Sequence, residues 1–263
     1  MKLFLQQNKV GLVGLLETKR KEHKAVTIAA NIFPGWHWVH NFSISKGRIW
    51  VAWNPRAFTV NTLKMSDQFI HRAAAQTATK ILFHITFIYG HNHELQCRPL
   101  WTELQQISLS VTGAWCIFGD FNTIMSINDR YGGNEVVDHD IQELSDFMRN
   151  YEVLEMPSSG AYFTWTNRSL WSKIERVFIN SLWYEEFDYS LAKILPPVLL
   201  DHSPILIQFL ETPKPPSMFQ YCDMWSSHKD FQSIISSNVP APNNPSIMRL
   251  IRDYFSHLRS RFK

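Results

Sequence analysis

The chain of 263 residues lacks the features that mark several specialised classes of protein. It has only three cysteines, Cys97, Cys116 and Cys222, and no CxxC pair, so the sequence suggests neither a disulfide framework nor a cysteine-ligated zinc site. No apolar run is long enough to span a membrane, and the first residues do not have the pattern of a signal peptide. We therefore expect an intracellular protein, nuclear or cytoplasmic, that has no contact with a membrane.

A strong excess of charge is also absent. The 26 Lys and Arg residues and 23 Asp and Glu residues give a formal net charge of +3, which is too small to argue for nucleic acid by itself. What the chain does have is apolar material, because 45% of its residues are hydrophobic. We expect one large domain with a substantial core and a short appendage, without internal repeats.

A proline-rich segment predicts the end of that domain. Residues 212–217 (TPKPPS) have the composition of a stiff linker, which places the large domain at residues 1–211. Residues 218–263 show weak helical periodicity and are interpreted as a helical connector or tail. Basic residues surround its apolar stripe, and they are interpreted as a solvated face rather than as a contact with nucleic acid.

The hydrophobic pattern in the first 211 residues is mostly that of strands, with helices between some of them. Alternating or continuous apolar runs predict strands at residues 10–16, 36–40, 48–53, 58–63, 69–76, 80–89, 115–119, 162–166, 174–179 and 205–209. Pro99 suits the first turn of a helix, and Asp140 can cap another. This order favours two sheets packed face to face with helices outside, an α/β sandwich.

The stretch at residues 115–122 (WCIFGDFN) delivers polar groups at the end of a buried strand. Side chains alternate along a strand, so Asp120 and Asn122 face the same way while Phe121 points into the opposite layer. Taken alone, this stretch is more typical of an ordinary turn. Its interpretation depends on the other strand ends.

Five predicted strand ends carry groups of this kind: Glu17; Tyr89; Asp120 with Asn122; Glu175; and Asp201 with His202. Together they supply oxygen ligands for a hard divalent cation, a histidine, a carboxylate that can orient it, and a phenol. That combination is typical of metal-assisted hydrolysis of a phosphate ester. Each residue alone also has an ordinary structural role, in a loop, at a core edge or in a turn.

In this order the five motifs resemble the endonuclease/exonuclease/phosphatase superfamily, which includes deoxyribonuclease-like proteins. The motifs are residues 17–19 (ETK), 89–90 (YG), 119–122 (GDFN), 173–176 (KIER) and 201–204 (DHSP). The resemblance is strongest to the endonuclease domain of plant LINE-type non-LTR retrotransposons, through residues 12–19, 34–36, 47–50 and 163–167. It covers roughly residues 5–210, and five ordered motifs are more specific than one.

The resemblance implies roles for each residue in cleaving DNA. Glu17 would bind Mg²⁺, with Mn²⁺ as a substitute, and Asp201 would assist the metal or the leaving group. Asp120 and Asn122 would position or deprotonate the attacking water. His202 would contact the phosphate, with Glu175 orienting it, and Tyr89 would hydrogen-bond the phosphate. Trp165 would stack on a base, although a buried core tryptophan is an equal alternative.

Two departures from the family pattern predict impaired activity in this copy. The family has an additional first strand that ends in an asparagine near the metal, and this sequence begins after it, so we expect a fold that lacks its first strand and exposes a strand edge. The tail resembles the connector before the elements' reverse transcriptase domain, which this sequence lacks. Glu175 stands where the family has aspartate, and a misplacement of ~1 Å can cost roughly a hundredfold in rate.

Two other functions share these observations. A non-catalytic remnant of a retrotransposon would bind nucleic acid weakly through phosphate contacts alone. A phosphatase acting on a small phosphorylated molecule would use the same set of polar groups. His91 and His93, which follow Tyr89, are a further possible metal pair, and a solvated loop is the alternative.

Overall fold

The computed structural model describes residues 1–133, 136, 138–187, 190–197 and 201–209. The expected linker at 212–217 and the tail at 218–263 lie outside these residues, so the division into domains stays a prediction. In the described part of the chain, no helix is long and apolar enough to cross a membrane. Cys97 and Cys116 are buried free thiols.

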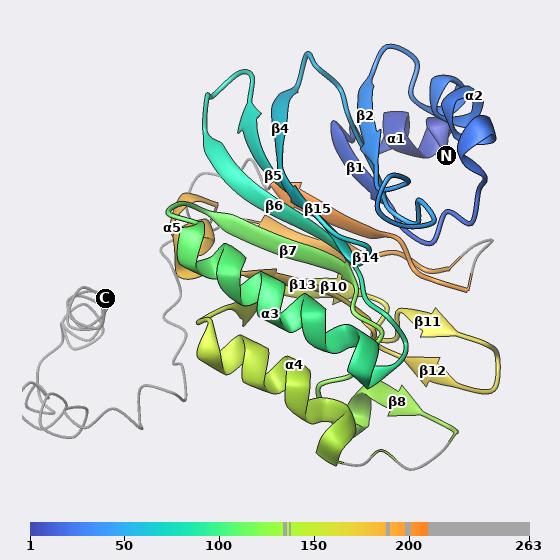
Figure 1. The fold of residues 1–263 in the computed structure, drawn as a ribbon, viewed down its shortest axis with the longest axis vertical. Helices are drawn as coiled ribbons and strands as arrows, with labels where there is room; N and C mark the ends of the chain where they lie inside the picture. Colours follow the sequence, from blue (N-terminus) through green and yellow to red (C-terminus); the bar gives the residue numbers. More distant parts are fainter. Residues whose placement is uncertain (134–135, 137, 188–189, 198–200, 210–263) are drawn as a thin grey trace, which may run out of the picture. The chain divides into compact units, whose positions relative to one another are not determined.

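A six-stranded sheet forms the centre of the fold (Figure 1). Its strands in spatial order are β4 (Phe58–Met65), β5 (Phe69–Gln76), β6 (Leu82–Tyr89), β7 (Trp115–Asp120), β13 (Glu175–Ile179) and β9 (Leu154–Glu155). Strands β6 and β7 are parallel, and the crossover between them is helix α3 (Glu94–Ser110). The parallel pair therefore ends at one edge of the sheet, where the antiparallel strand β13 begins.

Two three-stranded sheets form a second layer. One has the order β1 (Leu12–Leu15), β3 (Trp50–Trp53), β2 (His37–His40), and the other has β10 (Ser158–Gly160), β14 (Ser190–Ile194), β15 (Ile205–Phe209). Among the described residues, β1 and β15 each pair with a neighbour on one side only. The second layer is thus two separate sheets, each with a free edge strand.

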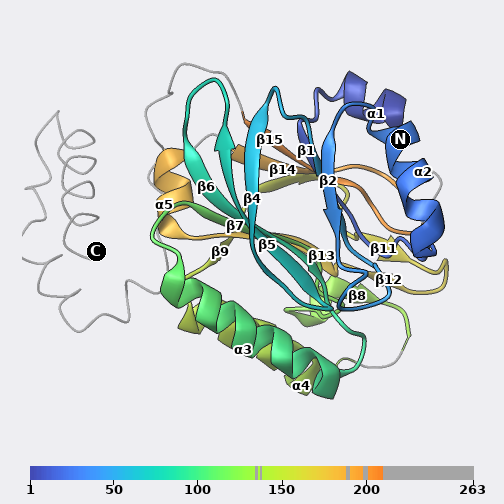
Figure 2. The same ribbon diagram turned by 45° about the horizontal axis from the view of Figure 1, so that its top comes forward.

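Figure 2 shows how the sheets and helices are layered, and three apolar clusters hold these layers together. The largest lies between the six-stranded sheet and the second layer, and includes Ile85, Phe87 and Val177 facing Val51 and Ala192. A second joins the other face of the six-stranded sheet to α3 and α4 (Asp138–Asn150). A third joins α1 (Lys2–Gln7) and α2 (Glu22–Ile32) to the outer face of the β1–β3–β2 sheet. The predicted α/β sandwich with outer helices is confirmed.

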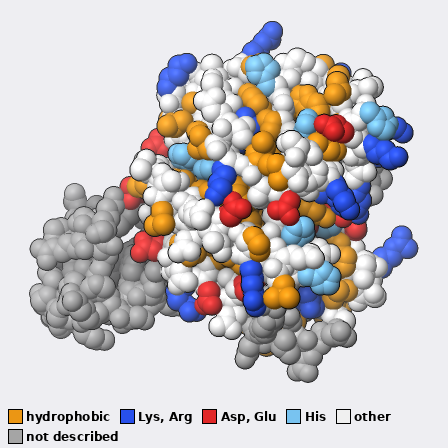
Figure 3. All heavy atoms as spheres, in the orientation of Figure 1, with side chains coloured by type: hydrophobic (Ala, Val, Ile, Leu, Met, Phe, Trp, Pro, Cys, Tyr) orange, Lys and Arg blue, Asp and Glu red, His pale blue; other side chains and the backbone are white. Residues whose placement is uncertain are grey.

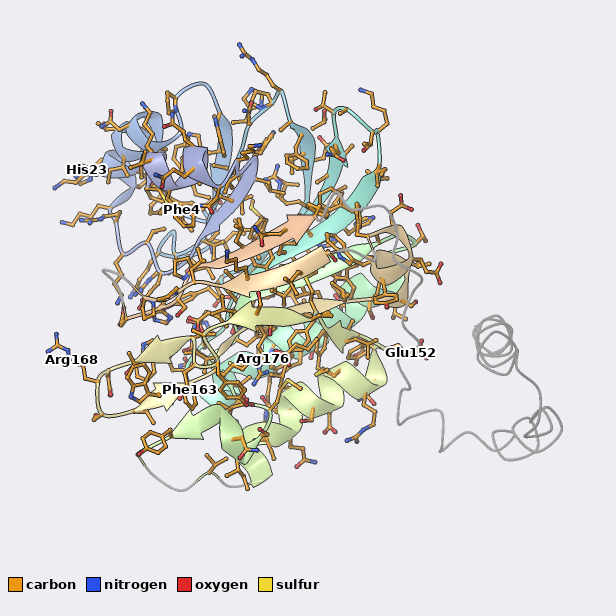
Figure 4. All side chains as sticks on the ribbon, turned by 180° about the vertical axis from the view of Figure 1, so that it is seen from behind. Phe4, His23, Glu152, Phe163, Arg168 and Arg176 are labelled. Carbon is orange, nitrogen blue, oxygen red and sulfur yellow. The ribbon has the colours of Figure 1, made fainter. Side chains whose placement is uncertain are left out.

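Short elements complete the described chain near the ends of β7 and β13. They are the 3₁₀ turn η1 (Ile127–Asp129), helix α5 (Ser181–Glu186) and a small sheet of β11 (Trp165–Thr166), β12 (Trp171–Ser172) and β8 (Arg130–Tyr131). Arg168 lies in the turn between β11 and β12 and projects away from the body of the protein (Figure 4).

Two expected helix starts were wrong. Helix α3 begins at Glu94, so Pro99 lies inside it rather than in its first turn. Proline has no N–H for the carbonyl of residue 95, but Leu95 is 71% exposed, and water can bind that oxygen instead. Helix α4 begins at Asp138, so Asp140 is within its first turn and does not precede it. The strand expected at 162–166 is shorter, at Trp165–Thr166.

The buried position of His71 predicts that the stability of the protein depends on pH. It is buried on β5, where its Nδ1 lies 2.8 Å from the Thr86 hydroxyl oxygen, and its ring stacks on His84. Burial, followed by the charges of His84 and Lys64, lowers the pKa of His71 to about 3. An unfolded histidine titrates near 6.5, so the unfolded chain holds more protons between these values.

We expect the contribution of His71 to the free energy of unfolding to fall as the pH is lowered from 7 to 5, whereas the raised pKa values of Asp120 and His202 act in the opposite direction. His71 alone contributes up to about 1.4 kcal/mol per pH unit once its unfolded form is protonated. His71→Gln should flatten this dependence by about one proton, measured by urea unfolding at several pH values. The control His23→Gln removes an exposed histidine of α2 and should leave the slope unchanged. Equal slopes in the His71 variant and the wild type would contradict the prediction.

Candidate active site

Three neighbouring strands bring a phenol and two carboxylates into one row. Tyr89 on β6 pairs with Asp120 on β7, and Asp120 pairs with Glu175 on β13. Side chains at paired positions of adjacent strands lie on the same face of a sheet. The order of the strands therefore places these groups side by side at the edge where the parallel pair ends.

His202 reaches this row from the other side. It forms an isolated bridge with Trp165 of β11, and its Nδ1 donates a hydrogen bond to the Glu175 carboxylate. The same nitrogen is 4.0 Å from Oδ2 of Asp120, and Nε2 is 3.8 Å from Oε2 of Glu17, which follows β1. Four segments that are distant in sequence thus supply one cluster.

Thr164 fixes the relation between Glu175 and the loop that carries His202. Its hydroxyl oxygen accepts the backbone N–H groups of Ile174 and Glu175, at 3.0 and 3.1 Å. Its carbonyl oxygen accepts the N–H of Ser203 at 2.7 Å. One buried threonine therefore holds both partners of the histidine–carboxylate pair.

Asn122 is held in a strained backbone conformation beside Asp120. Its φ is +51°, a region that residues other than glycine adopt infrequently. Its N–H donates to Oδ1 of Asp120 at 2.9 Å, and its side-chain amide donates to the carbonyl of Gly90 at 2.7 Å. These bonds compensate for the strain and fix the Asp120 carboxylate.

The loop after Asn122 is anchored by a buried ion pair. The guanidinium of Arg176, on β13, donates to Asp129 in η1 and to Glu155 on β9 at 3.0 Å. Asp129 also accepts the N–H groups of Met125 and Ser126, both at 2.9 Å. Arg176 is only 2% exposed and lies in the interior, whereas Arg168 projects outward (Figure 4). Arg176, the residue after Glu175, therefore fixes the loop that follows Asn122.

The electrostatics of the cluster follow from two carboxylates in one buried place. Burial, and then the negative charge of Glu175, raise the pKa of Asp120. Burial alone would lower the pKa of His202, but its hydrogen bond to Glu175 and the charges of Glu175 and Asp120 outweigh burial and raise it. The cluster therefore favours a charged imidazole and attracts further positive charge.

Glu17 and Tyr89 form the other wall of the site. Burial, followed by the charge of Glu17, raises the pKa of Tyr89 to about 12, so the phenol keeps its proton and can donate it. Glu17 forms an ion pair with Lys19, in which Oε1 of Glu17 lies 2.6 Å from Nζ of Lys19. Its φ of +51° is again unusual for a residue other than glycine.

The donor set fits a divalent cation. Ligand atoms of Asp120, Glu175 and His202 lie within 4.8 Å of one another, and Glu17 borders them. Oε2 of Glu175 is buried and has no hydrogen-bond partner, which leaves an acceptor for a cation or a water. The carboxylate oxygens suit Mg²⁺ or Mn²⁺, and His202, whose Nδ1–H is held by Glu175, adds positive charge beside them.

Some of the expected residues lie outside this cluster. The Asp201 side chain is exposed, and its carbonyl oxygen accepts the N–H of Thr166. Trp165 is half-buried, with its ring centroid 6.3 Å from that of His202. His91 lies within 2.7 Å of Asp67 Oδ2, so it contributes to a loop contact.

Sequence reasoning did not find the supporting residues Thr164, Asp129 and Arg176. The threonine and the arginine stand beside residues that were singled out, in the FTWTN and KIER motifs. The pattern gives no sign of their buried partners, because those contacts join segments that are far apart in the chain.

No protein-family model matches the sequence, and the search of curated proteins gives no match. Solved structures are similar in fold. The endonuclease domain of TRAS1, a telomere-specific non-LTR retrotransposon, superposes with a TM-score of 0.61 and 11% identity, over 78% of this chain and 88% of that domain. The 3′ phosphatase NExo from Neisseria, bound to a product DNA hairpin, has a TM-score of 0.59 and 18% identity, over 79% and 91%.

The apurinic endonuclease LMAP from Leishmania major gives a TM-score of 0.61 with 13% identity, over 78% of this chain and 80% of that protein. All three identities are too low to carry more than the fold. The described chain therefore has the fold of the endonuclease/exonuclease/phosphatase proteins.

Proposed function

We propose that the chain is a metal-dependent phosphodiesterase that nicks one strand of DNA, of the plant LINE retrotransposon type, with activity reduced in this copy. The observation that carries the proposal is the convergence of Asp120, Glu175 and His202 beside Glu17 and Tyr89. The likeness in fold to DNA-processing proteins supports it.

The residues have complementary tasks around a bound phosphate. Asp120 accepts the N–H of Asn122 at one oxygen, so its other oxygen can hold or deprotonate an attacking water. The phenol of Tyr89, which keeps its proton, can donate to a phosphate oxygen. A divalent cation held by Glu17 and the neighbouring carboxylates would stabilise the charge that grows on the phosphate.

His202 supplies positive charge on the opposite side. Its Nδ1–H is held by Glu175, which leaves Nε2 directed at the space beside Glu17. A charged imidazole at that position stabilises a phosphate most when its negative charge is largest, in the transition state. Glu175 is one methylene longer than the aspartate of the family, and it still accepts a hydrogen bond from His202. A reduced nicking rate would therefore come from a shifted position of the imidazole ring and not from a lost hydrogen bond.

The proposed function predicts metal-dependent nicking of DNA. The full chain should convert supercoiled plasmid to the nicked form with Mg²⁺ or Mn²⁺ and not with a chelator. Asp120→Ala and His202→Ala should each lower the rate by about a hundredfold or more, because each removes a group that acts in the transition state. A gel assay of the nicked fraction against time measures this.

The control variant is Lys80→Gln, which removes an exposed charge in the turn before β6 and should leave the nicking rate unchanged. Nicking that persists in Asp120→Ala would remove the proposed site. Turnover of p-nitrophenyl phosphate without nicking would favour the phosphatase, and neither activity in any metal would favour the non-catalytic remnant.

The second prediction concerns the histidine–carboxylate pair. Glu175→Gln removes the negative charge that holds the proton on His202, so the pKa of His202 should fall in the metal-free protein. The imidazole signals followed by NMR across a pH titration measure this directly. An unchanged titration of His202 would show that Glu175 does not hold it charged.

The third prediction concerns the reduced activity. Glu175→Asp shortens the side chain by about 1.5 Å, and if the longer side chain misplaces His202, nicking should rise roughly tenfold or more. The rate at saturating plasmid is the relevant measurement, because placement of the ring affects the chemical step. A lower rate in Glu175→Asp would show that the glutamate is the fitted residue here.

A further inference from the structure

A strongly basic hollow lies beside the site, outside the catalytic cluster. It has a volume of about 410 Å³ and is lined by Lys19, Arg20, Lys21, Glu22, Phe42, Lys46 and Arg48. Five of these seven residues are cationic and one is acidic. Lys and Arg side chains gather over this part of the surface in Figure 3. We call these residues the basic hollow.

The hollow is built by two loops that are bonded to each other. The Thr18 hydroxyl donates to the carbonyl of Gly47 at 2.6 Å, and the Thr18 N–H donates to the carbonyl of Arg48 at 3.3 Å. Gly47 has a φ of +66°, and a Cβ at this position would overlap the ring of Phe42. The backbone of the two loops that carry the basic side chains is therefore fixed by these contacts.

Two residues of the hollow adjoin the candidate active site. Lys19 pairs with Glu17, and Arg48 is close enough to Tyr89 for its charge to oppose the rise in the pKa of that phenol. In Figure 4, His23, in the first turn of α2, and Arg168, in the β11–β12 turn, project from the same end of the protein.

Most of this positive charge has no ion-pair partner in the part of the chain that the structure describes. Of the five cations, only Lys19 makes an ion pair with another described residue. The adjacent N-terminus of α2 adds a partial positive charge, since Lys21 at its N-cap gives no side-chain cap. Cations gathered in one place repel one another unless an anion joins them.

We propose that the basic hollow binds the phosphodiester backbone of a nucleic-acid strand, at phosphates next to the one held in the active site. The position of the cleaved phosphate rests on the proposed function, whereas binding in the hollow does not. Five cations spread over this volume exceed what one small phosphate monoester needs, and they match a chain of phosphates. The site thus favours a polymeric substrate over a small phosphorylated molecule.

Equilibrium binding without metal tests this separately from catalysis. A short fluorescein-labelled DNA duplex and a labelled single strand are titrated with the full chain in EDTA, at KCl concentrations between about 50 and 200 mM. Arg20→Gln/Lys46→Gln, which changes two exposed residues of the hollow, should weaken binding about tenfold and lower the salt slope by about two.

The matched control is Arg56→Gln/Lys80→Gln, which removes the same charge from exposed positions. Arg56 follows β3 and Lys80 precedes β6, so both lie at the ends of those strands away from the hollow and from Tyr89. The control should bind within about twofold of the wild type.

The outcomes separate the two proposals. Equal weakening in both double variants, or no weakening in either, would overturn the basic hollow as a binding site, even if plasmid nicking is normal. Selective weakening would support it even if no nicking is observed. Binding to anionic phospholipid vesicles in place of DNA, lost in the same variant, would overturn the assignment to nucleic acid.

Discussion

Two carboxylates facing each other across neighbouring strands are the constraint on which this site depends. The register of β7 and β13 sets Asp120 directly opposite Glu175 in a buried place, where two negative charges repel strongly. A single imidazole, His202, lies between them and the solvent, and the pair raises its pKa. The row is therefore stabilised by a proton on Asp120 or by positive charge nearby, which the histidine and a divalent cation can both supply.

The fold supplies this arrangement by bringing strand ends together from two layers. The parallel β6–β7 pair ends, and the antiparallel β13 begins, at the same edge, and His202 is held there by its bridge to Trp165 of β11. Buried polar contacts then fix the connecting loops, through Thr164 on one side and the Arg176–Asp129 pair on the other. Catalytic side chains in loops gain their accuracy from such contacts, because packing alone leaves several rotamers open.

Much of this was predictable from the sequence, and the reason lies in periodicity. The apolar runs ending at Tyr89 and Asp120 predicted strands, and their strand-end polar groups do converge. What could not be predicted is which distant segments meet: the hydroxyl of Thr164 on the N–H of Glu175, or Lys46 beside Lys19. The small net charge of the whole chain gave no sign of the basic hollow. Its cations come from two loops, and acidic residues elsewhere in the chain balance their charge. Short strands such as β10 and β14 are held by neighbours rather than by their own pattern.

The free edges of β1 and β15 have a consequence for the behaviour of the protein in solution. Among the described residues, each strand presents a row of backbone donors and acceptors with no partner on one side, although both pack on the main core. Neither β1 (LVGL) nor β15 (ILIQF) has the lysine, proline or bulge by which proteins protect exposed strands. Strand edges of this kind can accept one more strand, so the described part of the chain leaves two positions at which the second layer could be extended by further backbone pairing.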